Sequence, residues 1–145
     1  MKNFERSCVI IKPDSVEKRL IGKILEKIEN TSFNLESMEL TYASERQLVE
    51  HYKNLKNREF FRDLIKYMLS GPIIVLKVSG DNAIDELHKL AGNTDPNLAQ
   101  PETIRGNLSV YGGDKMHNFI HTSDSKQNAI NELNIWFDED RPCNL

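Results

Sequence analysis

The order in which strand-like runs and amphipathic segments follow one another constrains the fold of this chain more than any other feature. Four segments have the apolar composition or the alternation of strands: residues 7–11, 33–42, 73–78 and a short run that ends near His121. Apolar residues recur with a helical period in the other segments: about residues 20–28, 44–52, 60–68, 81–90 and 124–133. This order predicts an α+β fold with a split βαβ arrangement, in which a four-stranded antiparallel or mixed sheet carries helices on one face.

Local signals predict several helix ends. Ser44 and Gln47 form a capping-box pattern, which predicts a helix that begins just after Ser44. The run of residues 70–72, Ser-Gly-Pro, predicts the end of the helix before the third strand. We expect Ser123 or Asp124 to cap the last helix.

Residues 91–117 show no sustained period and are rich in glycine and proline. We therefore expect a long irregular loop here. Loops of this length in compact domains are usually functional or disordered.

Length and charge exclude several classes of protein. The 145 residues fit one domain, residues 1–145, and the net charge of −3 does not favour nucleic acid or an anionic membrane as partner. The apolar run 8–11 is too short for a signal-peptide core, and no run approaches a membrane span. The two cysteines, Cys8 and Cys143, do not form a disulfide framework, so we expect a cytoplasmic location.

The common glycine-rich phosphate-binding motifs and zinc motifs are absent from the sequence. The nearest approach to a P-loop, residues 112–115, is spoiled by Met116. If the protein binds phosphates, it does so with side chains from separate segments. The candidates are Lys12, Arg58, Thr94 and Arg105.

A histidine stands where the last strand meets the last helix, in the run of residues 118–125. A strand fixes the position of the His121 imidazole, and a helix start offers free backbone N–H groups and a positive dipole end. This context favours a histidine that meets an anion such as a phosphate.

Seven short runs together resemble one family. They are Ile11-Lys12-Pro13-Asp14, His51-Tyr52, Arg58-Glu59-Phe60-Phe61, Ser70-Gly71-Pro72, Gly92-Asn93-Thr94-Asp95-Pro96, Thr103-Ile104-Arg105-Gly106 and Asn118-Phe119-Ile120-His121-Thr122-Ser123-Asp124. In this order and spacing, over residues 5–137, the chain resembles a nucleoside diphosphate kinase. The resemblance implies a ferredoxin-like fold, with a four-stranded antiparallel sheet covered by helices.

The resemblance also implies a reaction. The γ-phosphoryl of a nucleoside triphosphate would pass to His121 and then to a nucleoside diphosphate, in a Mg²⁺-dependent ping-pong mechanism. Glu132 would hold the imidazole, Ser123 would support the ring or cap the helix, and Tyr52 would lie beside it. Lys12 would serve both catalysis and substrate binding. Mg²⁺ would arrive with the nucleotide phosphates rather than in a site made by the protein alone.

The family pattern assigns further side chains to substrate binding. They are Lys12, Arg58, Phe60, Leu64, His88, Thr94, Arg105 and Asn118. His88 takes the place of the family's usual arginine, so we expect one phosphate contact to be weaker. The stretch between Arg105 and His121 is about three residues longer than usual, which predicts an altered base or sugar preference.

Other interpretations are open at this point. Phe60 and Leu64 have the spacing of core residues, Glu132 could be an exposed helix charge, and we expect His51 and His117 to be structural or exposed. A nucleotide-binding module without catalysis is the alternative function; nucleic-acid binding is disfavoured by the charge. We expect a homo-oligomer, a hexamer or else a tetramer, although the tail after residue 137 is short and acidic.

Overall fold

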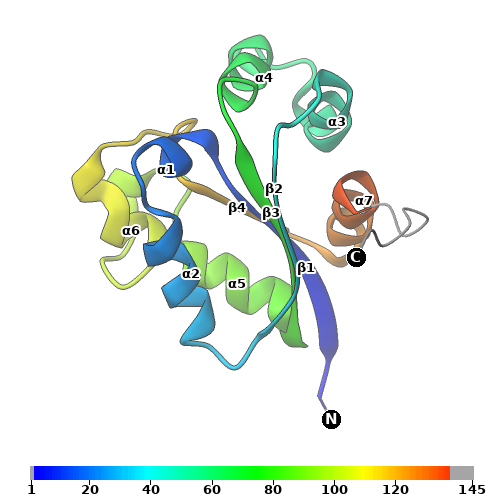
Figure 1. Ribbon diagram of the computed structural model, residues 1–145, viewed down its shortest axis with the longest axis vertical. Coiled ribbons are helices and arrows are strands. Elements are labelled where there is room, and N and C mark those ends of the chain that lie inside the picture. The colour runs from blue at the N-terminus through cyan, green and yellow to red at the C-terminus, as the bar shows by residue number, and fades with distance from the viewer. Residues whose placement is uncertain (1, 138–145) are drawn as a thin grey trace.

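A computed structural model describes residues 2–137 of the chain. The acidic tail and Cys143 lie outside the described residues. Four strands form one sheet in the order β2-β3-β1-β4. Their bounds are β1 (Phe4–Ile11), β2 (Asn34–Thr41), β3 (Ile73–Asp81) and β4 (Ile120–Thr122). Every neighbouring pair is antiparallel, which confirms the predicted four-stranded antiparallel sheet (Figure 1).

The sheet is longer at one end than the sequence indicated. The central strand β1 pairs with β3 from Phe4, opposite Asp81, to Ile11, opposite Ile74. Both strands extend three residues beyond the predicted apolar runs, because backbone pairing continues where the side chains become polar. Periodicity of apolar side chains does not report this extension.

Seven α-helices lie in the described part of the chain. They are α1 (Pro13–Glu17), α2 (Ile21–Glu29), α3 (Glu45–His51), α4 (Phe61–Met68), α5 (Ala83–Ala91), α6 (Ile104–Leu108) and α7 (Lys126–Trp136). The capping box is confirmed: the Ser44 hydroxyl accepts from the Gln47 N–H, and the Gln47 side chain accepts from the Ser44 N–H. None of the helices within residues 2–137 has both the length and the apolar character that crossing a bilayer requires.

Helices cover both faces of the sheet, so the expectation of helices on one face is wrong. Val9 and Ile11 of β1 face a core built with α2, α5 and α6, whereas Cys8 and Ile10 face a second core built with α3, α4 and α7 (Figure 1). A strand buried on both faces is apolar throughout rather than alternating. The unbroken apolar run 8–11 is the part of the sequence that indicates burial on both faces.

The expectation of an irregular segment at residues 91–117 is also wrong. This segment contains α6 and two 3₁₀ turns, η2 (Pro96–Leu98) and η3 (Ser109–Tyr111). The Thr103 hydroxyl caps α6 by accepting from the Gly106 N–H, and Ile104 and Leu108 enter the core. A five-residue helix is too short to show a helical period in the sequence.

The predicted cap of the last helix is shifted. Ser125 caps α7, since its hydroxyl accepts from the N–H of Asn128. Ser123 and Asp124 therefore do not cap the helix. Ser123 is fully buried and serves the site described below.

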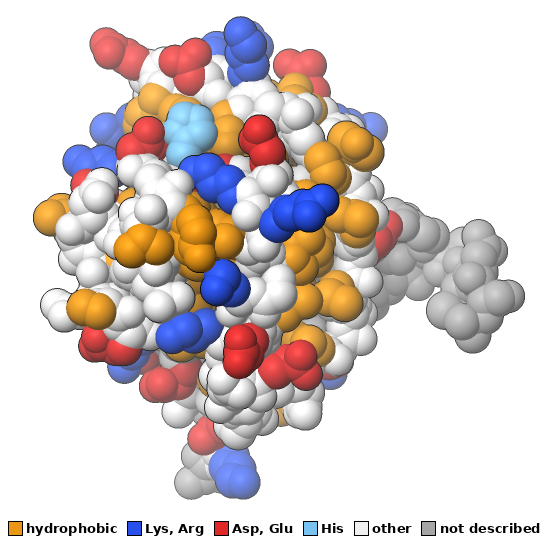
Figure 2. Space-filling model, turned by 60° about the vertical axis from the view of Figure 1, so that its left-hand side comes forward, with side chains coloured by type: hydrophobic (Ala, Val, Ile, Leu, Met, Phe, Trp, Pro, Cys, Tyr) orange, Lys and Arg blue, Asp and Glu red, His pale blue; other side chains and the backbone are white. Residues whose placement is uncertain are grey.

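The surface carries charges of both signs. On the face shown in Figure 2, apolar side chains lie among lysine, arginine and acidic side chains. This mixture fits a chain of which 28% of the residues are charged and the net charge is only −3.

Replacing Gly106 with alanine is expected to lower the free energy of unfolding by about 3 kcal/mol, because the new Cβ would overlap backbone atoms, which cannot move aside as a flexible side chain can. A Cβ at this position would lie 1.9 Å from the backbone oxygen of Gln100. Urea unfolding monitored by circular dichroism measures the change. Gly22→Ala is the matched control: a Cβ there meets nothing within 4 Å, and we expect a gain of about 0.5 kcal/mol from helix propensity. Equal stability of the two variants would contradict the prediction.

Candidate active site

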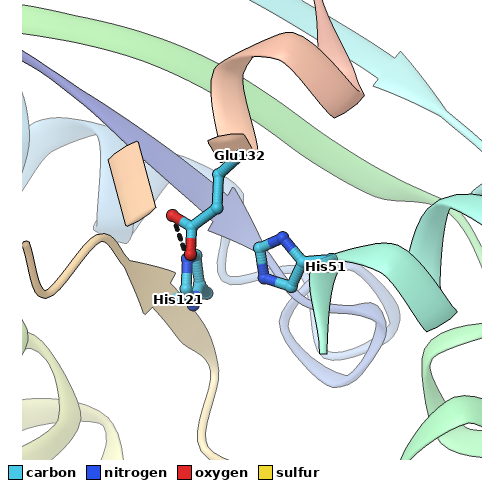
Figure 3. A group of neighbouring side chains, drawn as sticks. All are labelled: His51, His121 and Glu132. Carbon is cyan, nitrogen blue, oxygen red and sulfur yellow. Dashed lines mark hydrogen bonds and ion pairs between the residues drawn. The ribbon is translucent and has the colours of Figure 1, made fainter. Parts of the chain in front are cut away.

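His121 lies on the short strand β4 and is held by a carboxylate from α7. Its Nε2 lies 3.0 Å from Oε1 of Glu132 (Figure 3). The same carboxylate oxygen accepts a 2.6 Å hydrogen bond from the Ser123 hydroxyl. An ionised carboxylate only accepts, so the proton of a neutral His121 ring lies on Nε2 and the lone pair on Nδ1. Figure 3 shows the second ring nitrogen pointing away from Glu132.

Ser123 connects this pair to the centre of the sheet. Its hydroxyl accepts a 3.0 Å hydrogen bond from the backbone N–H of Cys8 on β1. Glu132 is 8% exposed, and Ser123 is fully buried. The predicted contact between His121 and Glu132 is therefore present, and Ser123 links it by a hydrogen bond to the central strand β1.

Burial keeps the imidazole uncharged. It lowers the pKa of His121 to about 3, and the nearby cations Lys12 and Arg105 add to this effect. Burial also raises the pKa of the Glu132 carboxyl. A histidine must be neutral to act as a nucleophile, and at neutral pH this one is.

A cavity of about 330 Å³ opens beside His121. Its lining includes Tyr52, His88, Thr94 and Arg105. The Tyr52 hydroxyl is buried and has no hydrogen-bond partner among residues 2–137. Burial raises its pKa, so the group remains a donor. A buried hydroxyl without a partner is costly, and a phosphate oxygen in the cavity is a group that it could serve.

Arg105 is fixed by three backbone carbonyls, one just after α5 and two on either side of Phe119. Its guanidinium donates to the carbonyls of Gly92 at 2.8 Å, Asn118 at 3.1 Å and Ile120 at 2.6 Å. A guanidinium has five N–H donors, so donors remain for an anion. Arg105 thus presents a positive charge in a fixed direction, at 6% exposure.

Lys12 lies at the end of β1, directly before α1. Its Nζ donates a 2.7 Å hydrogen bond to Oδ1 of Asn118. The Asn118 side-chain amide in turn donates to the carbonyls of Thr94 at 3.0 Å and Lys115 at 3.1 Å. Asn118 is 3% exposed and stands behind Lys12 as its support.

The backbone between Asn118 and Ile120 makes a tight turn. Phe119 has φ of +75°, and the Ile120 N–H donates to the Asn118 carbonyl at 2.9 Å. This is a γ-turn, a strained conformation that persists only where its surroundings hold it. The Phe119 N–H donates to Asp14, and its carbonyl accepts from the Lys12 N–H. The turn therefore fixes Asn118 relative to Lys12 just before the strand that carries His121.

A second hollow, of about 630 Å³, adjoins the first. Both are lined by Tyr52 and Leu55, and the second is also lined by Lys12, Phe60 and Leu64. Phe60 is 43% exposed, which leaves its ring face accessible to a flat apolar group. Residues 114–116 also line this hollow; they lie between Arg105 and His121, where the sequence predicts a longer stretch than usual.

The remaining predicted residues differ in exposure and in whether they line a hollow. His88 lines the cavity beside His121, with its Nδ1 3.2 Å from the Thr122 hydroxyl. Thr94 is an exposed lining residue. Arg58 is exposed and lines neither hollow. The structure brings the other candidates together around the two hollows.

Two histidines were expected to be structural or exposed. His117 is about half exposed and packs against Tyr67 and Asp114 outside the His121 cavity. His51 instead is half-buried and contacts the His121 ring, at 4.5 Å between ring centroids. Nothing in the sequence spacing indicates this contact. The only signal was its position next to Tyr52.

A neutral, oriented histidine that faces fixed cations, with an apolar hollow adjoining it, is the arrangement of a phosphotransferase acting on nucleotides. The family model for nucleoside diphosphate kinase matches residues 5–141. The chain belongs to the nucleoside diphosphate kinase family, whose members are phosphotransferases.

Known relatives cover most of this chain. The nucleoside diphosphate kinase of Methanocaldococcus jannaschii is 41% identical over 136 residues, which span 94% of this chain and 95% of the relative. Nucleoside diphosphate kinase A of Canis lupus familiaris is 42% identical over 137 residues, which span 94% and 88%.

Solved structures agree with the fold. The nucleoside diphosphate kinase of Aquifex aeolicus superposes with a TM-score of 0.89 at 32% identity, covering 94% of this chain and 97% of that one. The enzyme of Halobacterium salinarum in complex with CDP gives 0.88 at 34% identity, covering 95% and 90%. The ferredoxin-like α+β fold is confirmed.

Nucleotide binding is expected to take up close to one proton at pH 8.5. Burial, with Arg105 nearby, lowers the pKa of Lys12 to about 7, so its amine is mostly neutral at pH 8.5 in the free protein. A bound phosphate favours the charged amine and raises its pKa. Phosphate groups, whose second pKa is about 6, are already ionised at this pH. Calorimetry in buffers of different ionisation enthalpy measures the uptake, and its absence at pH 8.5 would contradict the prediction.

Proposed function

We propose that the chain transfers the γ-phosphoryl of a nucleoside triphosphate to a nucleoside diphosphate through a phosphohistidine on His121. In the first step the Nδ1 lone pair attacks phosphorus, an N–P bond forms, and the bond to the β-γ bridging oxygen breaks. The nucleoside diphosphate leaves with that electron pair. In the second step a β-phosphate oxygen of another diphosphate attacks the phosphorus of the phosphohistidine, a P–O bond forms, and the N–P bond breaks. Its electron pair returns to Nδ1, and His121 is neutral again.

One observation carries this proposal: the hydrogen bond between Nε2 of His121 and the Glu132 carboxylate. It commits one ring nitrogen as a donor and leaves the other as the nucleophile beside the cavity that Arg105 and Tyr52 also line. Charge spreads over the phosphoryl oxygens in the transition state, so fixed cations supply most of the remaining catalysis.

Within residues 2–137, one cluster has three side chains close enough to share a metal: His51, His121 and Glu132. Two of the three are imidazoles, whereas Mg²⁺ prefers oxygen ligands. We therefore propose that Mg²⁺ is bound by the nucleotide phosphates. When bound, it neutralises phosphate charge.

The second hollow is proposed to hold the base. The Phe60 ring and Leu64 offer an apolar surface, and stacking on an aromatic ring is worth about 1–3 kcal/mol for any base. Arg58 is proposed as a secondary phosphate contact from outside the hollows.

Labelling tests the function. The wild-type protein is incubated with γ-labelled ATP and Mg²⁺, separated from nucleotide, and then mixed with GDP. We expect an acid-labile, alkali-stable label on the protein that moves to GDP. Labelling without transfer favours the nucleotide-binding module with regulatory use, and the absence of any label contradicts the proposed mechanism.

We also propose that the chain forms a homo-oligomer, a hexamer or a tetramer, and that it works in the cytoplasm. The edge strand β2 supports assembly, because Met38, Leu40 and Tyr42 on it or directly after it are 57%, 63% and 72% exposed. Exposed apolar residues on an edge strand favour pairing with another chain. Light scattering after size exclusion tests assembly, and the mass of a single chain would contradict it.

A further inference from the structure

His51 ends helix α3 and its ring packs against the nucleophile. The two ring centroids are 4.5 Å apart and the ring planes are inclined by 74°. Figure 3 shows an edge of the His51 ring, bearing a nitrogen, turned toward the His121 ring. His51 also meets the Tyr52 ring edge-on, at 4.6 Å.

Trp136 determines where the His51 proton lies. Its indole N–H donates to Nδ1 of His51 at 3.0 Å. An indole nitrogen is a donor only, so Nδ1 of His51 must hold a lone pair. Burial, and then the neighbouring His121, lower the pKa of His51 to about 3, which keeps the ring neutral. The single proton of the neutral ring is therefore on Nε2.

This Nε2–H is buried and has no hydrogen-bond partner among residues 2–137. Buried donors are rarely left without an acceptor, and such exceptions call for an explanation. The His121 ring lies beside this edge of His51, with 4.5 Å between the two ring centroids (Figure 3). An N–H directed at an aromatic face forms a weak hydrogen bond.

A metal site is the alternative use of these side chains. One ligand atom each from His51, His121 and Glu132 lie within 4.8 Å of one another, and two histidines with one glutamate are a known zinc-binding set. A metal ligand needs a free lone pair, however. In His51 the Nδ1 lone pair is taken by Trp136, and Nε2 carries the proton. The tautomer thus argues against metal binding.

We infer that His51 is a positioning residue for the nucleophile: its Nε2–H edge bears on the face of the His121 ring and fixes the plane of that ring. Glu132 holds the ring at Nε2, and His51 prevents rotation about that attachment. Together they direct Nδ1 to the cavity. Trp136 acts through His51 by fixing its tautomer. This inference rests on the proposed function of His121.

The consequence is an effect on the transfer step with little effect on nucleotide binding. A reacting atom displaced by about 1 Å can cost about 100-fold in rate. His51 lines the same cavity as His121, yet its Nδ1 side is turned to Trp136 in the protein interior. We therefore expect replacement of the His51 side chain to leave Lys12 and Arg105, the proposed phosphate-binding cations, in place.

The test compares His51→Phe with His51→Gln. Phenylalanine keeps a planar ring without N–H, whereas the glutamine amide nitrogen stands near the position of the imidazole Nε2. Rapid-quench measurement with γ-labelled ATP gives the phosphorylation rate constant, and calorimetry gives Kd for ADP. We expect His51→Phe to slow phosphorylation about 10- to 100-fold with Kd changed less than about 2-fold, and His51→Gln to stay within about 5-fold of wild type. A rate within 2-fold of wild type for His51→Phe, or equal losses in the two variants, would overturn the inference.

A double variant separates positioning from stability. His51→Phe leaves the Trp136 N–H without an acceptor, and adding Trp136→Phe removes that donor as well. We expect the double variant to have a higher melting temperature than His51→Phe, although still below that of the wild type, while its phosphorylation remains slow. Recovery of the rate together with the melting temperature would assign His51 a structural role only and overturn the inference.

The tautomer can be read without activity. Nitrogen-15 NMR of the folded wild-type protein between pH 6 and 8 is expected to show His51 protonated at Nε2 and bare at Nδ1; the reverse tautomer would refute the inference even if no variant folds. The proposed function fails separately: a wild-type protein that takes no label contradicts the phosphohistidine and this inference, whereas a labelled wild type with an equally fast His51→Phe contradicts only this inference.

Discussion

Replacing His121 with glutamine is expected to lower kcat by about 10⁴-fold or more, as when a covalent catalyst loses its nucleophile. The glutamine amide nitrogen can occupy the position of Nε2 and donate to Glu132, so the carboxylate keeps a partner. An amide nitrogen has no available lone pair to attack phosphorus. Steady-state transfer from ATP to GDP measures the loss, and the labelling experiment should show no phosphoprotein.

His117→Gln is the matched control for this variant. It makes the same chemical change at a histidine that contacts Tyr67 and Asp114 and does not line the His121 cavity. We expect it to take up label and transfer it like the wild type. If His121→Gln retained label while folded, the nucleophile would have to be another residue.

The parts of the fold that could be predicted from sequence are those set by local interactions. The capping box at Ser44 and Gln47 depends on four consecutive residues, and the helix before residues 70–72 ends because of its own turn residues. The strand predicted at residues 7–11 was equally clear from its local composition. Its uniform burial, which places helices on both faces, is a tertiary property that the apolar run indicated but that only the packing decides.

The contacts within the site, in contrast, join residues that are far apart in the sequence. The partnership of His121 with Glu132 spans eleven residues of sequence and was available only through family resemblance. The contact of His51 with His121 joins residues seventy positions apart and left no periodic signal. Side chains from distant segments meet because the sheet and helices bring them together, and no local rule encodes that.

Arg105 shows why residues 91–117 were misinterpreted. Its three carbonyl partners come from the end of α5 and from both sides of the γ-turn, so the segment is ordered by contacts with other elements. Segments stabilised in this way carry no internal repeat of apolar residues. Their order becomes visible only once the partners are in place.

Replacing Lys12 with glutamine is expected to lower kcat/KM by about 10²- to 10³-fold, the range for removing one fixed group that stabilises transition-state charge. Lys12 lines the second hollow, and its Nζ donates a 2.7 Å hydrogen bond to Oδ1 of Asn118. Glutamine can keep the hydrogen bond to Asn118 but carries no charge. The same variant should take up no proton when it binds nucleotide at pH 8.5, because the group with the lowered pKa is gone.

The pKa of Lys12 also predicts how KM changes with pH. An amine whose pKa is lowered to about 7 is charged below that pH, so in the wild type KM should rise as the pH increases from 7 to 9. In Lys12→Gln, KM should be higher throughout and nearly flat over this range. Lys23→Gln, which removes the same charge from an exposed position on α2, is expected to match the wild type in both rate and pH profile. A wild-type KM that stays constant from pH 7 to 9, or a Lys12→Gln variant that keeps the wild-type slope, would show that another group binds the phosphates.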